Sequence, residues 1–333
     1  MRNPIGAAFA ALLLLSAGAA RAEVSEIRFA QQFSMGYLQF NVMAHQHLLE
    51  KHAAALGVPN LTVSWRTFSG PDNMNDALLA KAVDVVSGGV PGLVTIWAKT
   101  AGTPQEVRGI TGLSQTPILL NTRAPNVHSI KDLTSANKIA LPAVKVAIQA
   151  VVLEMAAAKE WGDKNYDKLD ELTMSLSPPD ATTGLLSNSS NFDSAFTIPP
   201  FQNLQLKNPA VHTILDSYDL MGQSTSSCAW TSKAFHDANP KVYQALVDAI
   251  KEASDIVAAD PRLAVTYYVE DSKTKMSVDE ILGFISDPRY RYSAVPLATK
   301  TYADFMYRVG KTKHEAKSWK DLFFPEIWDM NGS

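Results

Sequence analysis

Cysteine is almost absent from the sequence, since Cys228 is the only one among 333 residues. A single thiol excludes an intramolecular disulfide and any metal site built on two cysteines. No cysteine stands near residue 22, so we expect no lipid anchor of the bacterial lipoprotein type. Because no neighbouring base can be identified for Cys228, we predict a buried apolar side chain rather than a nucleophile.

Long apolar runs are also scarce, and the clearest one lies at the start of the chain. Arg2 supplies a positive charge, residues 5–15 form a run of 11 apolar or small residues, and residues 20–22 read Ala-Arg-Ala. This pattern is typical of a secretory signal peptide. The run is shorter than the roughly 20 residues that span a bilayer, and no later segment reaches about 18 apolar residues without a charge. We therefore predict cleavage after Ala22 and a soluble periplasmic protein of residues 23–333.

Positive charge is not in excess. Without the two arginines of the signal peptide, 28 basic residues face 33 acidic ones, a net charge of −5. This balance argues against a nucleic-acid partner. The remaining length exceeds what one hydrophobic core usually serves, so we expect two lobes in one monomeric protein.

Catalytic motifs are missing as well. The sequence has no G-x-S-x-G, H-E-x-x-H, Walker A or G-x-G-x-x-G pattern, and residues 112–116 fail the first of these at the last position. On one helix, His45 and His47 would project about 200° apart and could not share a metal ion. We predict a binding protein without metal or cofactor rather than an enzyme.

Short β-rich runs alternate with helical ones along the chain, which predicts an α/β protein with mostly parallel sheets. The expected strands are residues 26–33, 61–68, 84–87, 107–113, 117–122, 138–141, 172–176, 192–196 and 226–231. The expected helices are residues 38–56, 73–82, 92–99 and 143–161, followed by a helical tail at 240–259, 261–269, 278–285 and 301–309. We expect the tail to pack against the first lobe.

The two halves of the chain share one arrangement. In each half a helix leads to a short strand with an acidic residue and then to a loop that contains proline. The first half has Asp84 and Pro91, and the second has Asp193 with Pro199 and Pro200. We expect the two aspartates to bond backbone or cap helices rather than to touch a ligand.

Four segments in this order resemble one family of ABC importers. They are residues 31–37 (QQFSMGY), 80–91, 130–142 and 192–200. The chain is similar to substrate-binding proteins for alkanesulfonates, taurine, nitrate and thiamine precursors. The resemblance implies the two-lobed fold of type II periplasmic binding proteins, in which the lobes close by a hinge motion. It places lobe I at residues 23–116 and 226–333, and lobe II at residues 117–225.

The resemblance also implies a ligand site where strand ends of both lobes face one cleft. Five segments would supply it: Gln32, Ser34 and Tyr37; Ser87, Gly88 and Gly89; Ser114, Gln115 and Thr116; Ala143, Val144 and Lys145; and Thr197 with Phe201. The three residues from Ala143 would form a helix start, which can bind an anion through free N–H groups. Tyr37 and Phe201 are candidates for stacking on a planar ligand, with core packing as the alternative.

Lys145 is the only basic residue in these segments, which are otherwise rich in glutamine, serine, threonine and glycine. This composition favours a small organic anion held by neutral donors. A planar heterocycle such as a thiamine-precursor pyrimidine is the alternative, as is a secreted enzyme on the same fold. The expected partners are the small ligand and a permease in the inner membrane, and the sequence does not separate a permease from a signalling receptor.

Overall fold

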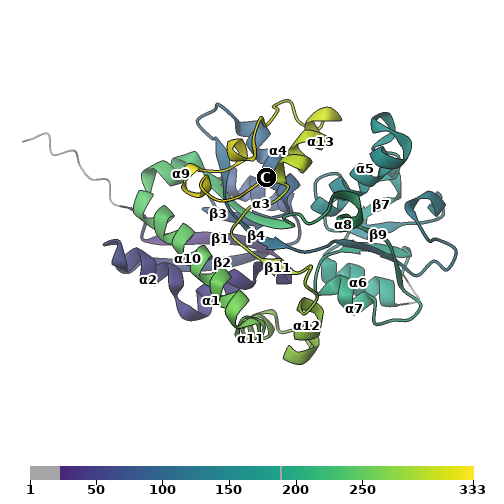
Figure 1. Cartoon of the computed structure of the whole chain (residues 1–333), viewed down its shortest axis with the longest axis horizontal. Helices are drawn as coiled ribbons and strands as arrows, with labels where there is room; N and C mark the ends of the chain where they lie inside the picture. The colour runs from purple at the N-terminus through teal and green to yellow at the C-terminus, as the bar shows by residue number, and fades with distance from the viewer. Residues whose placement is uncertain (1–22, 188–189) are drawn as a thin grey trace, which may run out of the picture.

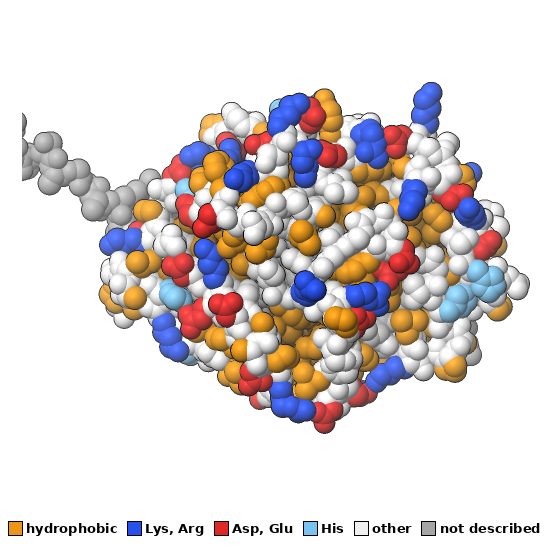
Figure 2. Space-filling view, in the orientation of Figure 1, with side chains coloured by type: hydrophobic (Ala, Val, Ile, Leu, Met, Phe, Trp, Pro, Cys, Tyr) orange, Lys and Arg blue, Asp and Glu red, His pale blue; other side chains and the backbone are white. Residues whose placement is uncertain are grey.

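The structure is a computed structural model that describes residues 23–187 and 190–333. The predicted signal peptide lies outside the described residues. The described chain forms two sheets side by side, each with its own helices (Figure 1). Within the described ranges, no helix is both long and apolar enough to cross a membrane. Charged side chains of both signs are interspersed over the face seen in Figure 2.

The first sheet has six strands in the order β11-β4-β10-β3-β1-β2. Strand β1 lies between β2 and β3 and is parallel to both, while β10 runs antiparallel between β3 and β4. The strands are β1 Glu26–Gln32, β2 Thr62–Phe68, β3 Val85–Gly88, β4 Val107–Gln115, β10 Ser227–Ser232 and β11 Arg291–Tyr292.

The second sheet has five strands in the order β7-β6-β8-β5-β9 and repeats this topology. Strand β6 lies between β7 and β8 and is parallel to both, and β5 runs antiparallel to β8 and β9. The strands are β5 Leu119–Thr122, β6 Ile139–Leu141, β7 Thr173–Ser175, β8 Ser194–Thr197 and β9 His212–Asp216. The mixed α/β class predicted from the sequence is confirmed.

We call the first sheet with its helices lobe I and the second sheet with its helices lobe II. Lobe I carries α1 Leu38–Gln46, α2 Leu48–Ala55, α3 Pro71–Leu79, α4 Val90–Thr100, α9 Lys233–Ala238, α10 Pro240–Ala259, α11 Pro261–Ser272, α12 Val278–Ile285 and α13 Thr299–Arg308. Lobe II carries α5 Ile148–Trp161, α6 Pro178–Leu186, α7 Phe201–Gln205 and α8 Ser217–Met221. Helix α10 packs on α1 and α2, so the tail covers lobe I.

The two aspartates of the internal repeat have the same role in both lobes. Asp84 precedes β3, and its carboxylate accepts a hydrogen bond at 2.9 Å from the backbone N–H of Arg28 in β1. Asp193 precedes β8 and accepts one at 3.3 Å from the backbone N–H of Lys138, just before β6. Each carboxylate thus ties two parallel strands together, as expected for residues that bond backbone.

Two helix predictions were wrong at their boundaries. The helix expected over residues 38–56 is two helices, because His47 adopts a left-handed conformation with φ of 52° and ends α1. The helix expected from Ala143 begins at Ile148, because Lys145 is also left-handed, with φ of 67°. Such a φ cannot continue a right-handed helix.

The chain crosses between the lobes at residues 116–118, between β4 and β5, and at residues 222–226, between α8 and β10. Ser226 joins the two crossings, since its hydroxyl lies 3.0 Å from the hydroxyls of both Ser114 and Thr116. These groups are almost fully buried. The crossings are therefore the natural place for a hinge between the lobes.

Candidate functional site

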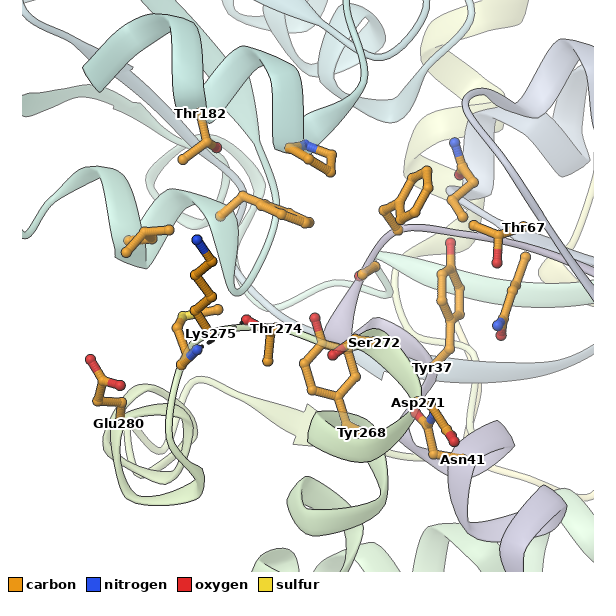
Figure 3. Close-up of a pocket in the computed structure, with 18 of the residues that line it drawn as sticks. Tyr37, Asn41, Thr67, Thr182, Tyr268, Asp271, Ser272, Thr274, Lys275 and Glu280 are labelled. Atoms are coloured by element: carbon orange, nitrogen blue, oxygen red, sulfur yellow. Dashed lines mark hydrogen bonds between the residues drawn. The ribbon is translucent and has the colours of Figure 1, made fainter. Parts of the chain in front are cut away.

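A cavity of about 680 Å³ lies between the lobes (Figure 3). Lobe I lines it with the end of β1, the first turns after it, the end of β2, and the tail from α11 to α12. Lobe II lines it with α6 and α7. The lining residues are Gln31, Gln32, Phe33, Ser34, Tyr37, Asn41, Thr67, Pro179, Thr182, Thr183, Phe201, Leu204, Tyr268, Asp271, Ser272, Thr274, Lys275, Met276 and Glu280. Its volume suits a small organic molecule.

Lys275 is the only basic residue among those that line the cavity. It lies in the loop between α11 and α12, and its side chain extends toward the lobe II side, where Thr182 lies (Figure 3). Across the described ranges, no carboxylate forms an ion pair with it. A free ammonium group beside hydroxyl and amide groups can bind an anion.

The two acidic residues of the lining have partners of their own. Asp271 accepts hydrogen bonds from the amide of Asn41 at 2.6 Å and from the ring of His45 at 2.9 Å. Glu280 pairs with Lys207 of lobe II and caps its own helix through Ser277. These bonds lower the pKa of Glu280 to about 2, so it stays ionised and paired with Lys207.

Aromatic side chains form the apolar part of the lining. Phe33 is 43% exposed, which is unusual for so large an apolar side chain, and Phe201 comes from the facing lobe. Tyr268 borders the cavity from α11 (Figure 3). Phe33 and Phe201 leave apolar surface free in the cleft, where a ligand can cover it.

Tyr37 is both a core residue and a lining residue. It is only 2% exposed, and its ring stacks on Phe40 with centroids 6.1 Å apart. Burial raises the pKa of Tyr37, and a hydrogen bond with Ser227 opposes part of the rise. The phenol is therefore neutral at physiological pH and can act only as a hydrogen-bonding or packing group.

A second, much smaller cavity of about 20 Å³ lies where strand ends of both lobes meet. It has room for about one water molecule. Gly89, which precedes α4, and Ile148, which begins α5, approach each other here. A Cβ on Gly89 would lie 2.6 Å from the Cβ of Ile148. Nearby, the N–H of Met35 donates to the carbonyl of Pro199 in lobe II at 3.1 Å. The lobes are thus closed on each other at this point.

Some of the residues predicted for the site line these cavities and others do not. Gln32, Ser34, Tyr37 and Phe201 line the large cavity, and Gly89 lines the small one. Ser87, Gly88, Ser114, Gln115, Thr116 and Thr197 are buried within strands or in the crossing segment and line neither. The hydroxyl of Ser87, for example, donates to the carbonyl of Ala30 at 3.1 Å.

The predicted helix start at Ala143, Val144 and Lys145 lies outside both cavities. Lys145 is left-handed, so the chain turns here and α5 begins only at Ile148. The three predicted residues line neither cavity. The backbone carbonyl of Lys145 accepts a hydrogen bond from Lys311 at 2.9 Å. The first turn of α5, with Ile148 and Gln149, faces the small cavity instead.

The sequence did not predict that the C-terminal helical tail would line the large cavity. Residues 268–280 come from α11, α12 and the loop between them, and they supply Lys275. Amphipathic helices of this kind show which face packs inward but not which helix end meets the other lobe. The mainly polar segment Ser272 to Ser277, which separates α11 from α12, was the available sequence signal for a loop at the cavity. Among the described residues, no cluster of three or more histidine, cysteine, aspartate or glutamate side chains forms a metal site.

The sequence matches no protein-family model and no curated protein. The fold, in contrast, is shared with solved structures of periplasmic binding proteins. An alkanesulfonate-binding protein, SsuA from Xanthomonas axonopodis pv. citri bound to MOPS, has a TM-score of 0.69 at 16% identity, over 88% of this chain and 96% of that chain. The nitrate-binding protein NrtA from Synechocystis PCC 6803 has a TM-score of 0.67 at 15% identity, over 87% of this chain and 83% of that chain.

The aliphatic sulphonate binding protein SsuA from Escherichia coli is a further structure of the same kind. Its TM-score is 0.64 at 17% identity, over 90% of this chain and 99% of that chain. The chain therefore has the periplasmic binding protein fold, which confirms the two-lobed architecture that the sequence resemblance implied.

Proposed function

We propose that this protein is the exported solute-binding component of an ABC importer, and that it captures a small organic anion between its lobes. Lobe I is residues 23–116 and 226–333, and lobe II is residues 117–225. The protein acts as a periplasmic monomer and passes the solute, unchanged, to an inner-membrane permease. The binding proteins with the same fold, for sulfonates and for nitrate, support this role.

One observation carries the choice of ligand: Lys275 is an unpaired cation in a cavity with aromatic walls. Phe33, Phe201 and Tyr268 fit the apolar body of a molecule whose anionic group reaches the ammonium of Lys275. Hydroxyl and amide groups such as Thr274 and Gln32 can complete the hydrogen bonds of that group. MOPS, a sulfonate on a short chain with a ring, has this form and is bound by a structure of the same fold.

The first prediction tests the role of Lys275. In calorimetric titrations of residues 23–333, we expect a sulfonate such as MOPS or an arylcarboxylate to bind, and Lys275→Gln to weaken it about tenfold to a hundredfold. This range follows from the loss of one charge-assisted hydrogen bond, worth about 1.5–3 kcal/mol. Lys273→Gln is the matched control, because Lys273 lies two residues away and does not line the cavity.

Two results would contradict the proposed contact between an organic anion and Lys275. Binding of neutral pyrimidines and not of anions, unaffected by Lys275→Gln, would favour the heterocycle alternative. Equal losses in the Lys275→Gln and Lys273→Gln variants would show a general effect of charge rather than a specific contact.

A further inference from the structure

The lobes also touch on a side of the molecule away from the large cavity. Helix α13 of lobe I approaches α5 of lobe II and the turns that follow it (Figure 1). The rings of Phe305 and Tyr166 meet edge to face, with centroids 6.3 Å apart. Arg308 pairs with Asp163 at 2.8 Å in an exposed ion pair. Helix α13 itself packs on α4, so these contacts join the two lobes.

A buried ion pair lies within this contact. Lys311, just after α13, donates to a carboxylate oxygen of Glu154 in α5 at 2.5 Å. The side chain of Glu154 is only 1% exposed and that of Lys311 is 15% exposed. Lys311 also donates to the carbonyl of Lys145 and lies over the ring of Tyr166. One lysine of lobe I thus holds three groups of lobe II.

Few interactions offset the cost of burying the charge of the Glu154 carboxylate. Among the described residues, its second oxygen, Oε2, has no hydrogen-bond partner. The described charges that act on Glu154 are the acidic Asp167 and Asp170 and one base, Lys311. Burial is the largest influence and Lys311 opposes it only partly, so the pKa of Glu154 rises to about 7. Burial also raises the pKa of Asp170, where Lys311 and Lys145 oppose it.

We propose that Glu154 and Lys311 make closure of the lobes proton-dependent, with Glu154 taking up a proton as the lobes close. The inference rests on the hinge motion of the proposed function. Opening the lobes separates α13 from α5 and exposes Glu154 to water, where its pKa returns toward its ordinary value.

The sign of the pH dependence follows from this difference. The closed state holds a carboxyl group with a raised pKa, so protons favour closure, and this contribution to closure is lost as pH rises from about 4.5 through about 7. With pKa values of about 7 closed and 4.5 open, the closed-to-open ratio falls about tenfold between about pH 6 and pH 8. A group that is ionised in both states to the same extent would give no such change.

The test measures the distance between the lobes in the free protein, so it needs no knowledge of the solute. Fluorophores are placed on Asn73→Cys in lobe I and Lys164→Cys in lobe II, both exposed, while the native Cys228 is fully buried and stays unlabelled. We expect energy transfer to report opening as pH rises from about 4.5, with the change levelling off above about pH 7. Glu154→Gln, a neutral isostere, should remain in the low-pH state throughout.

A second variant keeps the test decisive if the first is unstable. Lys311→Met removes the only favourable charge beside Glu154, so the midpoint should move above that of the parent protein. Arg308→Gln is the control, because it breaks the exposed pair with Asp163 and should leave the titration unchanged. A distance that does not depend on pH in the parent protein, or a titration that survives in Glu154→Gln, would overturn the proposal. Either result leaves solute binding, measured separately, unaffected.

Discussion

Gly89 lies at a close contact between the two lobes, and its lack of a side chain allows that approach. Its backbone, with φ of −64° and ψ of 145°, is open to any residue, so the requirement for glycine is purely steric. A Cβ at this position would lie 2.6 Å from Cβ and 2.9 Å from Cγ2 of Ile148 in the facing lobe. The contact therefore joins the two lobes as they lie in this structure.

The second prediction follows from this contact. Gly89→Ala should keep each lobe stable but hold the lobes apart, because the new methyl group meets Ile148. We expect solute affinity to fall about tenfold or more, with the melting temperature of the free protein nearly unchanged. Ile148→Gly in the same chain removes both the Cβ and the Cγ2 that the new methyl group would meet, and it should restore much of the affinity. If the Gly89→Ala variant bound as well as the parent protein, the two residues would not meet in the bound state.

The residues of the candidate site show what local pattern can and cannot indicate. Gln32 ends the first strand, and Ser34 and Tyr37 follow it. The rule that ligands bind at strand ends predicts all three as site residues. Lys275 lies in the tail, more than 230 residues further along, and only long-range packing brings it to the same cavity. Ala143, Val144 and Lys145 line neither cavity, and the left-handed Lys145 lies before the start of α5.

At the scale of helices and strands, the most periodic segments were predicted best. The expected helices at 240–259 and 278–285 agree with α10 and α12 to the residue, since each begins after a capping position and has a clear apolar face. Strand β9 and the short helices α7 and α8 were missed. Each has only five residues, too few for a period to be evident.

The third prediction concerns the hydrogen bonds by which Asp84 and Asp193 join two parallel strands. Asp84→Asn keeps an acceptor for the Arg28 N–H but loses the ion pair with the Arg28 guanidinium, whereas Asp84→Ala loses both. We expect Asp84→Ala to lower the free energy of unfolding by about 1–3 kcal/mol and Asp84→Asn to cost less. Denaturant melts would show this.

Asp193 offers a comparison within the same chain. Its carboxylate accepts from the amide of Asn137 at 2.6 Å and from the Lys138 N–H, but it has no arginine partner among the described residues. The difference between its alanine and asparagine variants should therefore be smaller than at Asp84. The reverse order would mean that the Arg28 ion pair contributes little to the stability of lobe I.

At the scale of the whole molecule, the two lobes are built on one plan and joined by two short crossings. Each has a central strand between parallel neighbours, an aspartate that fixes the third strand, and an antiparallel strand beyond it. Only the tail breaks the symmetry. It covers lobe I with α10, lines the cavity with α11 and α12, and reaches lobe II through Tyr290, whose hydroxyl lies 3.0 Å from the Asn203 amide. The tail is thus the part of the chain best placed to couple ligand contact to the position of the lobes.

The last prediction is that the solute leaves the protein chemically unchanged. The only thiol, Cys228, is fully buried in β10, and burial raises its pKa far above neutrality, so it is no nucleophile. His45 stacks on Tyr267 and bonds the lining residue Asp271, but it does not line the cavity itself. After prolonged incubation of the protein with excess MOPS, mass spectrometry should recover the compound intact. Product formed at more than one equivalent per protein chain would show turnover, and the protein would then be an enzyme on this fold.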